Sequence, residues 1–555
     1  MPTESNPESP NPNESQPPPL EQEPLVTAEI VTPVDARGNP VREQPPVRLR
    51  EILAVVALVV LADVTIFRAH GFAGYVAFFV LAPLLFLLGA PRPRFGVSFW
   101  VLSLMLILLV AKMLWCGSWL LVASGVALLV AFATALSGLR PYVLDTVAFA
   151  LQTPLAGYEG LNRYRRSTEK LRPGVCGGIW LEFGLPAAAL VAFGLLFILA
   201  NPDMLVYFGK TIEWAATNLR DWLLLIAPSW EEALFWLAVL WVCVGLLRPV
   251  VTRVLLEEKS AATPPEGSAA GRASLYSPFR NTLVTLVGLF AIYLVFEFWT
   301  LWFQPFPEGF HYSGYAHEGA AWLTVALALA TVILSLIFQG PILQDARLGR
   351  LRRLAWVWSL ENMLLAVAVY HRLYIYVVFN GMTWMRTVAI FGMSCVVVGF
   401  VLVVWKIIHN RDFVWLMRRH LWALALTVYL FALTPVDTIV HTYNVWRILS
   451  GDPAPSVQIS EHPISSEGVL VLIPLTECTD ETIREGVCAL LARHHEEAEM
   501  LAQRRKEKGW TAYQLSDRLV IEGLRAQSSR WTLYNDRQKR DAALERFHNY
   551  AYQWW

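Results

Sequence analysis

Residues 97–115, VSFWVLSLMLILLVAKMLW, form an almost unbroken apolar run that decides the class of this protein. An α-helix rises about 1.5 Å per residue, so a run of this length crosses the roughly 30 Å hydrocarbon core of a bilayer. The whole chain of 555 residues shares this character, because 55% of its residues are hydrophobic, 16% are charged and its mean hydropathy is +0.43. A soluble core cannot hide so much apolar surface. The sequence therefore predicts an all-α integral membrane protein in contact with the lipid bilayer.

Further runs of this kind occur along the chain. Counting those of roughly 20 mainly apolar residues yields eleven. We therefore expect a polytopic bundle of about eleven transmembrane helices over residues 50–440. The predicted runs are 51–67, 71–90, 97–115, 117–138, 178–200, 230–247, 281–303, 318–339, 354–379, 384–407 and 419–440.

The amino-terminal residues 1–49 differ sharply in composition from the rest. The first 47 residues contain 12 prolines and no Phe, Trp or Tyr. Such a segment can bury too little apolar surface to offset the entropy of ordering it. We expect it to be a disordered Pro-rich tail on the cytoplasmic side of the membrane.

Basic residues alternate between the loops in a way that predicts the orientation. When the amino terminus is placed in the cytoplasm, 25 Lys and Arg residues lie in the inner loops and six lie at or near the outer ends. This bias satisfies the positive-inside rule. The six outer residues are Arg68, Lys112, Lys210, Arg220, Arg372 and Arg386.

One segment, residues 204–227, is ambiguous. Its apolar residues recur at helical spacing, but four charged residues interrupt it, namely Lys210, Glu213, Arg220 and Asp221. That pattern suits a helix lying along the membrane interface. If the segment were a further span, 13 of the inner basic residues would move to the outer side, so eleven spans are favoured over twelve.

An odd number of spans places residues 441–555 outside the cytoplasm, where we expect a small, mainly helical domain. The apolar stretch GVLVLIPL, residues 468–475, is compatible with a strand. Helical patterns follow it, with Asp480 and Asp536 as plausible helix starts. The predicted helices cover about residues 481–505, 511–527 and 536–553.

Two cysteines, Cys478 and Cys488, lie ten residues apart in this region. They would share an oxidising compartment if the predicted topology holds. The sequence leaves open whether they form a disulfide or stay as two thiols.

The ionisable residues of the predicted spans gather toward the outer ends. A charge at mid-bilayer costs about 2.5 to 3.5 kcal/mol even on the lenient insertion scale, so these side chains should pair with one another or line a polar cavity. Glu297 with Arg372, or Asp63 with Arg386, are possible interhelical pairs that would serve packing alone. The alternative is an outward-facing pocket that binds a small solute, an ion or a lipid. Its candidate binding residues are Asp63, Glu297, His317, Glu318, Arg372 and Arg386.

Recognisable enzyme motifs are missing from the sequence. It contains no Walker A loop, no GxSxG elbow, no HExxH helix and no CxxC pair. We therefore predict no catalytic residue, no metal site and no cofactor, and do not expect an enzyme. Lys plus Arg and Asp plus Glu both number 45, so no net basic field favours a nucleic-acid partner.

Several short motifs resemble a known family. They are Asp63; Tyr315-Ala316-His317-Glu318-Gly319 leading to Leu323; Arg372-Leu373 with Tyr376; Gly381-Met382-Thr383 with Arg386; and Tyr443-Asn444-Val445 with Arg447. These residues are similar to those of uncharacterised bacterial multi-pass membrane proteins, grouped as domains of unknown function four-one-five-three and four-one-seven-three. The resemblance covers much of residues 50–450 and implies a polytopic fold in a bacterial cell membrane. It implies no activity.

The chain departs from the family pattern at two positions. His317 stands where the family has an arginine, and Ala320 stands where it has a phenylalanine. If that arginine makes a salt bridge in the family, His317 would do so only when protonated. Such a pairing would therefore depend on pH in this chain.

Two functions from different classes follow from these observations. The first is a transporter-like or ligand-sensing protein with an outward-facing polar pocket. The alternative is a non-catalytic scaffold or signalling component of the cell envelope, which presents its C-terminal domain to a partner. A solvated cavity lined by Glu297, His317, Glu318 and Arg372 would favour the first, whereas a closed cluster of salt bridges would favour the second. An intramembrane enzyme acting on lipid ranks third.

Overall fold

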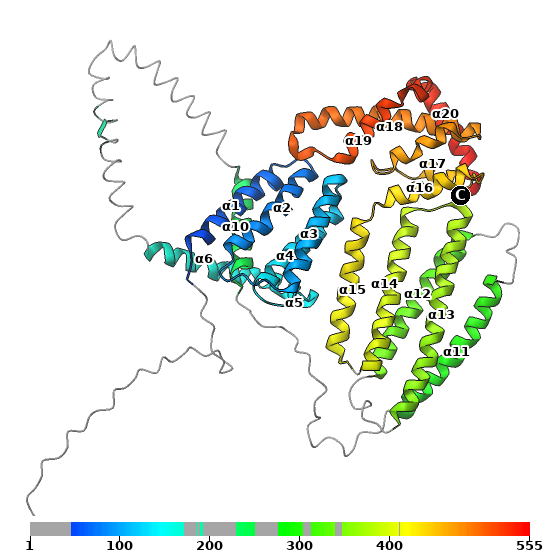
Figure 1. Cartoon of the computed structure of the whole chain (residues 1–555), viewed down its shortest axis with the longest axis horizontal. Helices are drawn as coiled ribbons and strands as arrows, with labels where there is room; N and C mark the ends of the chain where they lie inside the picture. The colour runs from blue at the N-terminus through cyan, green and yellow to red at the C-terminus, as the bar shows by residue number, and fades with distance from the viewer. Residues whose placement is uncertain are drawn as a thin grey trace, which may run out of the picture. The chain divides into compact units, whose positions relative to one another are not determined.

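Helices built from the predicted apolar runs make up most of the structure. The computed structural model describes residues 46–170, 229–249, 276–302, 312–338, 347–409 and 411–555, with four isolated positions between 186 and 193. Every regular element in these ranges is a helix (Figure 1). Nearly all of the predicted tail 1–49 lies outside the described residues, as do segment 204–227 and, apart from the isolated positions, the predicted run 178–200.

Eight of the described helices are long and apolar enough to cross a membrane. One of them, α3, has the same bounds as the run that predicted it. The eight are α2 (Phe72–Gly89), α3 (Val97–Trp115), α4 (Trp119–Leu136), α10 (Trp230–Leu247), α11 (Tyr276–Trp302), α13 (Leu348–Asn380), α14 (Trp384–His409) and α15 (Phe413–Leu433).

Two more predicted runs are helical but have a shorter apolar part. Helix α1, Leu49–Ala62, continues into a π-helical turn, η1, at Asp63–Phe67, so that the two elements together cover the run 51–67. Helix α12, Tyr312–Ile337, has a described apolar part of Ala321–Ile337. The structure thus supports a multi-pass membrane protein with eight candidate spans among the described residues. The total of eleven stays a prediction.

The connection after α4 contains two helices of its own, α5 (Val143–Leu151) and α6 (Thr153–Lys170). Helix α6 packs closely against α10. A Cβ atom on Gly157 would lie only 2.2 Å from Cδ1 of Trp241, so the absence of a side chain at this position permits the approach. This packing holds the connection against α10.

The predicted eleventh span, residues 419–440, is wrong as a single helix. The structure divides it into α15, which ends at Leu433, and α16, Val436–Leu449. Pro435 lies at the break. Proline has no N–H for the helical hydrogen-bond ladder, and it disfavours the helical conformation of the preceding residue. Thr434 accordingly has extended backbone angles.

The helices that follow α16 differ in length and share one apolar core, whose largest buried side chains are Trp531 and Phe547. Asp480 and Asp536 accept hydrogen bonds from backbone N–H groups at the starts of two of them, so the predicted helix starts are confirmed. The elements are α17 (Ser456–Glu461), η4 (Val469–Glu477), α18 (Glu481–Lys508), η5 (Trp510–Ala512), α19 (Leu515–Ala526), η6 (Ser528–Asn535), α20 (Arg537–Ala551) and η7 (Tyr552–Trp554).

Residues 468–475, whose pattern was compatible with a strand, instead form most of the 3₁₀ helix η4. A short apolar run cannot be assigned to helix or strand from periodicity alone. Its buried residues Val469, Leu472 and Leu475 are three positions apart. A 3₁₀ helix has three residues per turn, so these side chains form one apolar stripe.

Cys478 and Cys488 are both buried, and neither is part of a disulfide. Of the two alternatives that the sequence left open, the structure contains the free thiols. Burial raises the pKa of the Cys488 thiol above its ordinary value, so this side chain is less reactive than an exposed cysteine.

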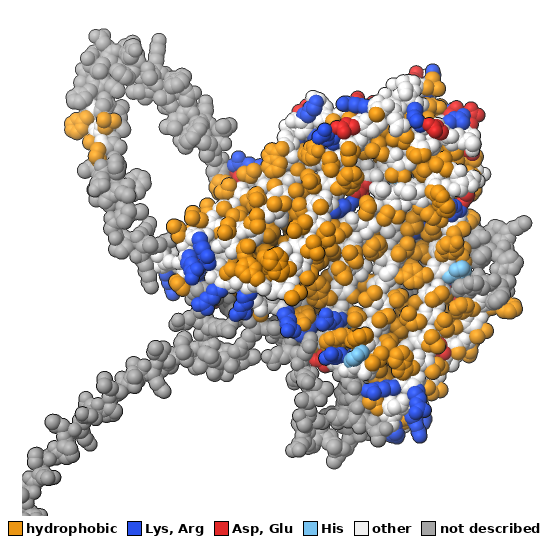
Figure 2. All heavy atoms as spheres, viewed as in Figure 1, with side chains coloured by type: hydrophobic (Ala, Val, Ile, Leu, Met, Phe, Trp, Pro, Cys, Tyr) orange, Lys and Arg blue, Asp and Glu red, His pale blue; other side chains and the backbone are white. Residues whose placement is uncertain are grey.

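The molecular surface matches the division between spans and connections. Figure 2 shows hydrophobic side chains covering the long helices, whereas Lys and Arg gather at the lower ends of these helices. Acidic and basic side chains are mixed over the C-terminal helices in the same view. An extended apolar surface of this kind is expected where helices face lipid.

Candidate functional site

The turn between α13 and α14 is the most highly connected polar feature near the predicted site residues. Helix α13 ends because Gly381 has φ of +97°, a conformation that residues with a side chain rarely adopt. Thr383 then accepts a hydrogen bond at its Oγ1 from the backbone N–H of Arg386, at 3.2 Å, which caps the start of α14. The turn therefore exposes several backbone groups that need partners.

Arg386 supplies the first of these partners. Its guanidinium donates to the backbone oxygen of Gly381 and to the side-chain oxygen of Asn380. The same group lies 3.7 Å from the centre of the Tyr376 ring, a distance at which a cation is attracted to the aromatic face. Arg386 is buried, so its charge is held by dipoles and an aromatic ring.

Side chains from the C-terminal part of the chain complete the enclosure. Asn444, on α16, accepts from the backbone N–H of Met382 at 2.7 Å and donates to the backbone oxygen of Met382 at 2.9 Å. Gln458, on α17, donates to the backbone oxygen of Asn380 at 3.0 Å. Asn380 in turn donates from its side chain to the backbone oxygen of Trp554 at 3.2 Å. Two distant segments therefore hold one turn.

Arg447 extends the same network along α16. It donates to the backbone oxygen of Val378 at 2.9 Å and to the hydroxyl of Tyr443 at 3.0 Å, and it pairs with Asp452. We call residues 380–383, together with Arg386, Asn444, Arg447 and Gln458, the turn clamp. Its members other than Arg447 and Thr383 are largely buried.

Glu297 and Arg372 form the interhelical pair that the sequence allowed. Arg372 donates from Nε and Nη2 to the two carboxylate oxygens at 2.5 and 2.6 Å, and the Tyr293 hydroxyl donates to the carboxylate at 2.9 Å. Both charged residues are buried, Glu297 completely. This bidentate arrangement between α11 and α13 satisfies both oxygens of the carboxylate.

Asp63 and Arg386 are not partners, so the second suggested pair is wrong. Asp63 accepts a hydrogen bond from Trp236 Nε1 at 2.9 Å, and its other oxygen lies 3.0 Å from Nε of Arg68. Arg68 also donates to Glu232. The π-helical turn that begins at Asp63 places Arg68, five positions later in the chain, close to its carboxylate. Arg68 is therefore the partner of Asp63 instead of the distant Arg386.

His317 and Glu318 lie in the first two turns of α12. Their side chains fall outside what the structure describes, since the described side chains of this helix begin at Ala321. The six candidate binding residues are thus distributed over separate places: one network at Asp63, the pair of Glu297 with Arg372, the turn clamp at Arg386, and the start of α12.

Two buried contacts escaped the sequence analysis. Lys112, at the end of α3, pairs with Glu467, whose backbone oxygen accepts a hydrogen bond from Thr438 Oγ1 at 3.0 Å. At the opposite end of the spans, Arg248 makes a bidentate pair with Glu51 at 2.5 and 2.8 Å. In each case the basic residue was noticed only for its side of the membrane. The sequence signal that could have revealed these pairs was an acidic residue, Glu51 or Glu467, at the start of an apolar run.

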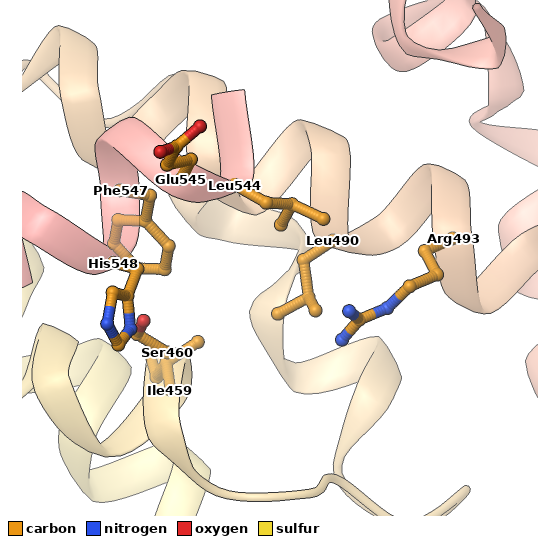
Figure 3. A pocket seen from close by; sticks show the side chains of 8 residues that line it. All are labelled: Ile459, Ser460, Leu490, Arg493, Leu544, Glu545, Phe547 and His548. Carbon is orange, nitrogen blue, oxygen red and sulfur yellow. The ribbon is translucent and has the colours of Figure 1, made fainter. Parts of the chain in front are cut away.

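A cavity of about 280 Å³ lies between α17, α18 and α20 (Figure 3). His548 at its edge pairs with Glu461 at 2.5 Å. The cavity is lined by Ile459, Ser460, Leu490, Arg493, Leu544, Glu545, Phe547 and His548. These are all residues of the C-terminal helices, so this space is distinct from the outward pocket expected between the spans.

Comparison with known sequences connects the turn clamp to a family. A sequence model of the family described as Domain of unknown function (DUF4153) matches residues 96–473. The chain belongs to this family. The match runs from α3 into η4 and includes every residue of the turn clamp. No curated protein and no solved structure matches the chain.

The turn clamp also explains how several motifs of the DUF4153 resemblance are related. Tyr376, Gly381-Met382-Thr383 and Arg386 are brought together with Asn444 and Arg447 of the later motif. In the sequence the two groups are about 60 residues apart. Their shared role in this DUF4153 protein is to join the end of α13 to the helices that follow the last span.

Proposed function

We propose that this protein is a non-catalytic membrane scaffold, in which the spans hold the C-terminal helical region, residues 441–555, in one orientation for a protein partner. The observation that carries the proposal is that the buried charges of Glu297 and Arg372 are paired with each other. A solute site needs polar groups that are free to bind the solute. Both oxygens of Glu297 already accept hydrogen bonds, from Arg372 and Tyr293.

The contacts between the spans and the C-terminal region also support a scaffold. The turn clamp joins α13 and α14 to α16, α17 and η7. Lys112 joins α3 to Glu467. Buried hydrogen bonds and ion pairs of this kind restrain relative motion, because breaking one leaves a polar group without a partner in a poorly solvated place. A rigid connection is what a scaffold requires.

The transporter-like or ligand-sensing function is the alternative. It is supported by the gathering of ionisable residues toward the outer ends of the predicted spans. In this alternative Asp63, Glu297, His317, Glu318, Arg372 and Arg386 would bind a small solute, an ion or a lipid.

The location that we propose is the inner membrane of a bacterial cell, with a cytoplasmic amino terminus and an extracytoplasmic C-terminal region. The excess of basic residues in the predicted inner loops supports this orientation. A tag on Trp555 should be cut by external protease in spheroplasts. Cleavage only after lysis would contradict the orientation.

An isosteric replacement of the buried pair separates the two functions. Replacing a buried ion pair by apolar residues of similar volume is often neutral or stabilising. The double variant Glu297→Leu/Arg372→Met should therefore be made at normal levels and, if the pair serves only packing, should complement a deletion strain fully. A transporter would lose function in this variant although the protein is present.

The single variant Arg372→Met is the matched control, because it leaves the carboxylate of Glu297 buried without its basic partner. It should reduce the amount of folded protein in either case. Lipid and solute profiles of the deletion strain provide the readout, together with photo-crosslinking from the C-terminal region to detect a protein partner. A stable double variant that fails to complement would contradict the scaffold.

A further inference from the structure

The short helix η5 is held against the end of a candidate span. The backbone N–H of His70, just before α2, donates to Thr511 Oγ1 at 3.1 Å. A Cβ atom on Gly71 would lie 2.8 Å from the Cα atom of Ala512, so the two backbones are in direct contact. Thr511 and Ala512 are buried there. The residues on either side of them therefore lie at the level where α2 begins.

Aromatic side chains mark this level as the membrane boundary. Trp119, the first residue of α4, packs edge-on against Phe72 and Tyr75 of α2, with ring centres 5.5 and 5.9 Å apart. Trp115 lies at the end of α3, on the same side of the bundle. Trp and Tyr are enriched where hydrocarbon meets headgroups. Helix η5 is thus held at the depth of the lipid headgroups.

Large apolar side chains next to this contact are exposed. Trp510 is 58% exposed, Leu501 47% and Tyr513 41%. Leu501 lies about two turns before the end of α18. Trp510 is the first residue of η5, and Tyr513 follows η5 directly. Amphipathic rings in such a position can enter the headgroup region.

Basic residues accompany these rings. Arg504, Lys506 and Lys508 in the last two turns of α18 are exposed, and Glu507 is the acidic residue among them. Arg505 is different, because it pairs with Asp517 at the start of α19. That pair joins the two helices and fixes the orientation of the segment. Figure 2 shows Lys and Arg side chains over this end of the C-terminal helices.

We propose that the end of α18 and η5, residues 500–513, form a docking surface for the headgroups of anionic phospholipids in the membrane that the protein spans. The excess of positive charge on Arg504, Lys506 and Lys508 is complementary to the phosphate groups. Trp510 and Tyr513 insert between headgroups and fix the depth. The surface does not depend on the proposed scaffold function, because it requires only that α2 crosses the membrane.

Hydrogen exchange of the full-length protein in lipid nanodiscs tests the proposal. One disc contains only phosphatidylcholine, and the other contains phosphatidylglycerol in addition. The amides of residues 500–513 should exchange more slowly in the anionic disc, by about threefold or more given the attraction per basic residue near a charged surface. Added salt should weaken the difference, since it screens exposed charges.

Two variants of equal charge change provide the control. Arg504→Gln/Lys506→Gln/Lys508→Gln should abolish the difference between the two discs. Arg537→Gln/Lys539→Gln/Arg546→Gln, which removes three exposed basic residues of α20, should keep it. Equal exchange of the wild-type segment in both lipids would overturn the proposal, as would a lipid-dependent difference that survives in the first variant. If the surface binds a soluble protein instead of lipid, exchange should be equal in the two discs.

Discussion

Arg372 and Glu297 form a bidentate ion pair that joins α13 to α11, with hydrogen bonds of 2.5 and 2.6 Å between side chains that water barely reaches. The two residues lie 75 positions apart in the chain. Removing one member of such a pair leaves the other charge buried without compensation.

Arg372→Ala should consequently destabilise the protein by about 3–5 kcal/mol. The measurement is the thermal unfolding midpoint of the purified full-length chain in detergent micelles. Arg537→Ala, at a basic position whose side chain is 86% exposed, is the matched control and should change the midpoint little. A midpoint for Arg372→Ala equal to that of the control would show that the pair contributes no stability.

Gly381→Ala should loosen the turn clamp. The backbone at this position has φ of +97°, which costs on the order of 1–3 kcal/mol for a residue with a side chain. The added Cβ would also lie 2.6 Å from Oδ1 of Asn444 and 2.9 Å from Cβ of Pro455. Faster proteolysis of the helices after α16, relative to wild type, is the expected result.

Gly392→Ala is the control for this substitution. Gly392 lies within α14, and an added Cβ would meet no atom within 4 Å. Alanine in a helix interior is favoured over glycine by roughly 1 kcal/mol, so this variant should be as resistant to protease as wild type or more so. Equal sensitivity of the two variants would exclude a special role of the turn.

Lys112 and Glu467 should show energetic coupling. Both side chains are mostly buried, with exposed fractions of 13% and 7%. Lys112→Glu and Glu467→Lys should each lower the unfolding midpoint, because each places two like charges together. The double exchange should recover part of the loss, with a coupling energy of about 0.5–3 kcal/mol. Additive effects of the two substitutions would mean that the side chains do not interact.

Acid should destabilise the C-terminal helices through His494. Burial, together with the nearby charge of Arg493, lowers the pKa of His494 to about 4, below the value of about 6.5 for an unfolded histidine. The unfolded state therefore binds more protons as the pH falls below about 6.5, and folding stability is lost progressively until the pH approaches about 4.

The expected loss between about pH 7.5 and pH 5 is on the order of 1–2 kcal/mol. Hydrogen exchange of residues 481–508 at the two pH values measures it, and His494→Gln should reduce the difference. His462 is the control, because its side chain is exposed. If His462→Gln flattened the pH profile as much as His494→Gln, the effect would not belong to His494.

The parts of the fold that depend on neighbouring residues were predictable from the sequence. Helix α3 needs only a run of apolar residues as long as the bilayer is thick, and its predicted bounds agree with the structure. Asp480 and Asp536 cap helices through local bonds to residues two or three positions away. Asp63 was expected to be paired, and it is, although with the nearby Arg68.

Contacts between distant uncharged residues were not predictable, whereas the charged pair of Glu297 with Arg372 was anticipated. Asn444 and Met382 are 62 positions apart, and Gln458 and Asn380 are 78 apart. Neutral amides carry no charge that would reveal them as partners, so a search for ionisable groups passes over them. Residues 468–475 were compatible with a strand because a short apolar run fits both patterns. The burial of every third side chain in the structure identifies the 3₁₀ helix η4.

Helix α13 contains 33 residues, which corresponds to a length of about 50 Å, well beyond the roughly 30 Å of hydrocarbon. A rod of this length must either lean within the bilayer or project from it. Its last residue, Asn380, is bonded to Gln458 and Trp554. Any displacement of the end of α13 is therefore transmitted to the C-terminal helices through these hydrogen bonds.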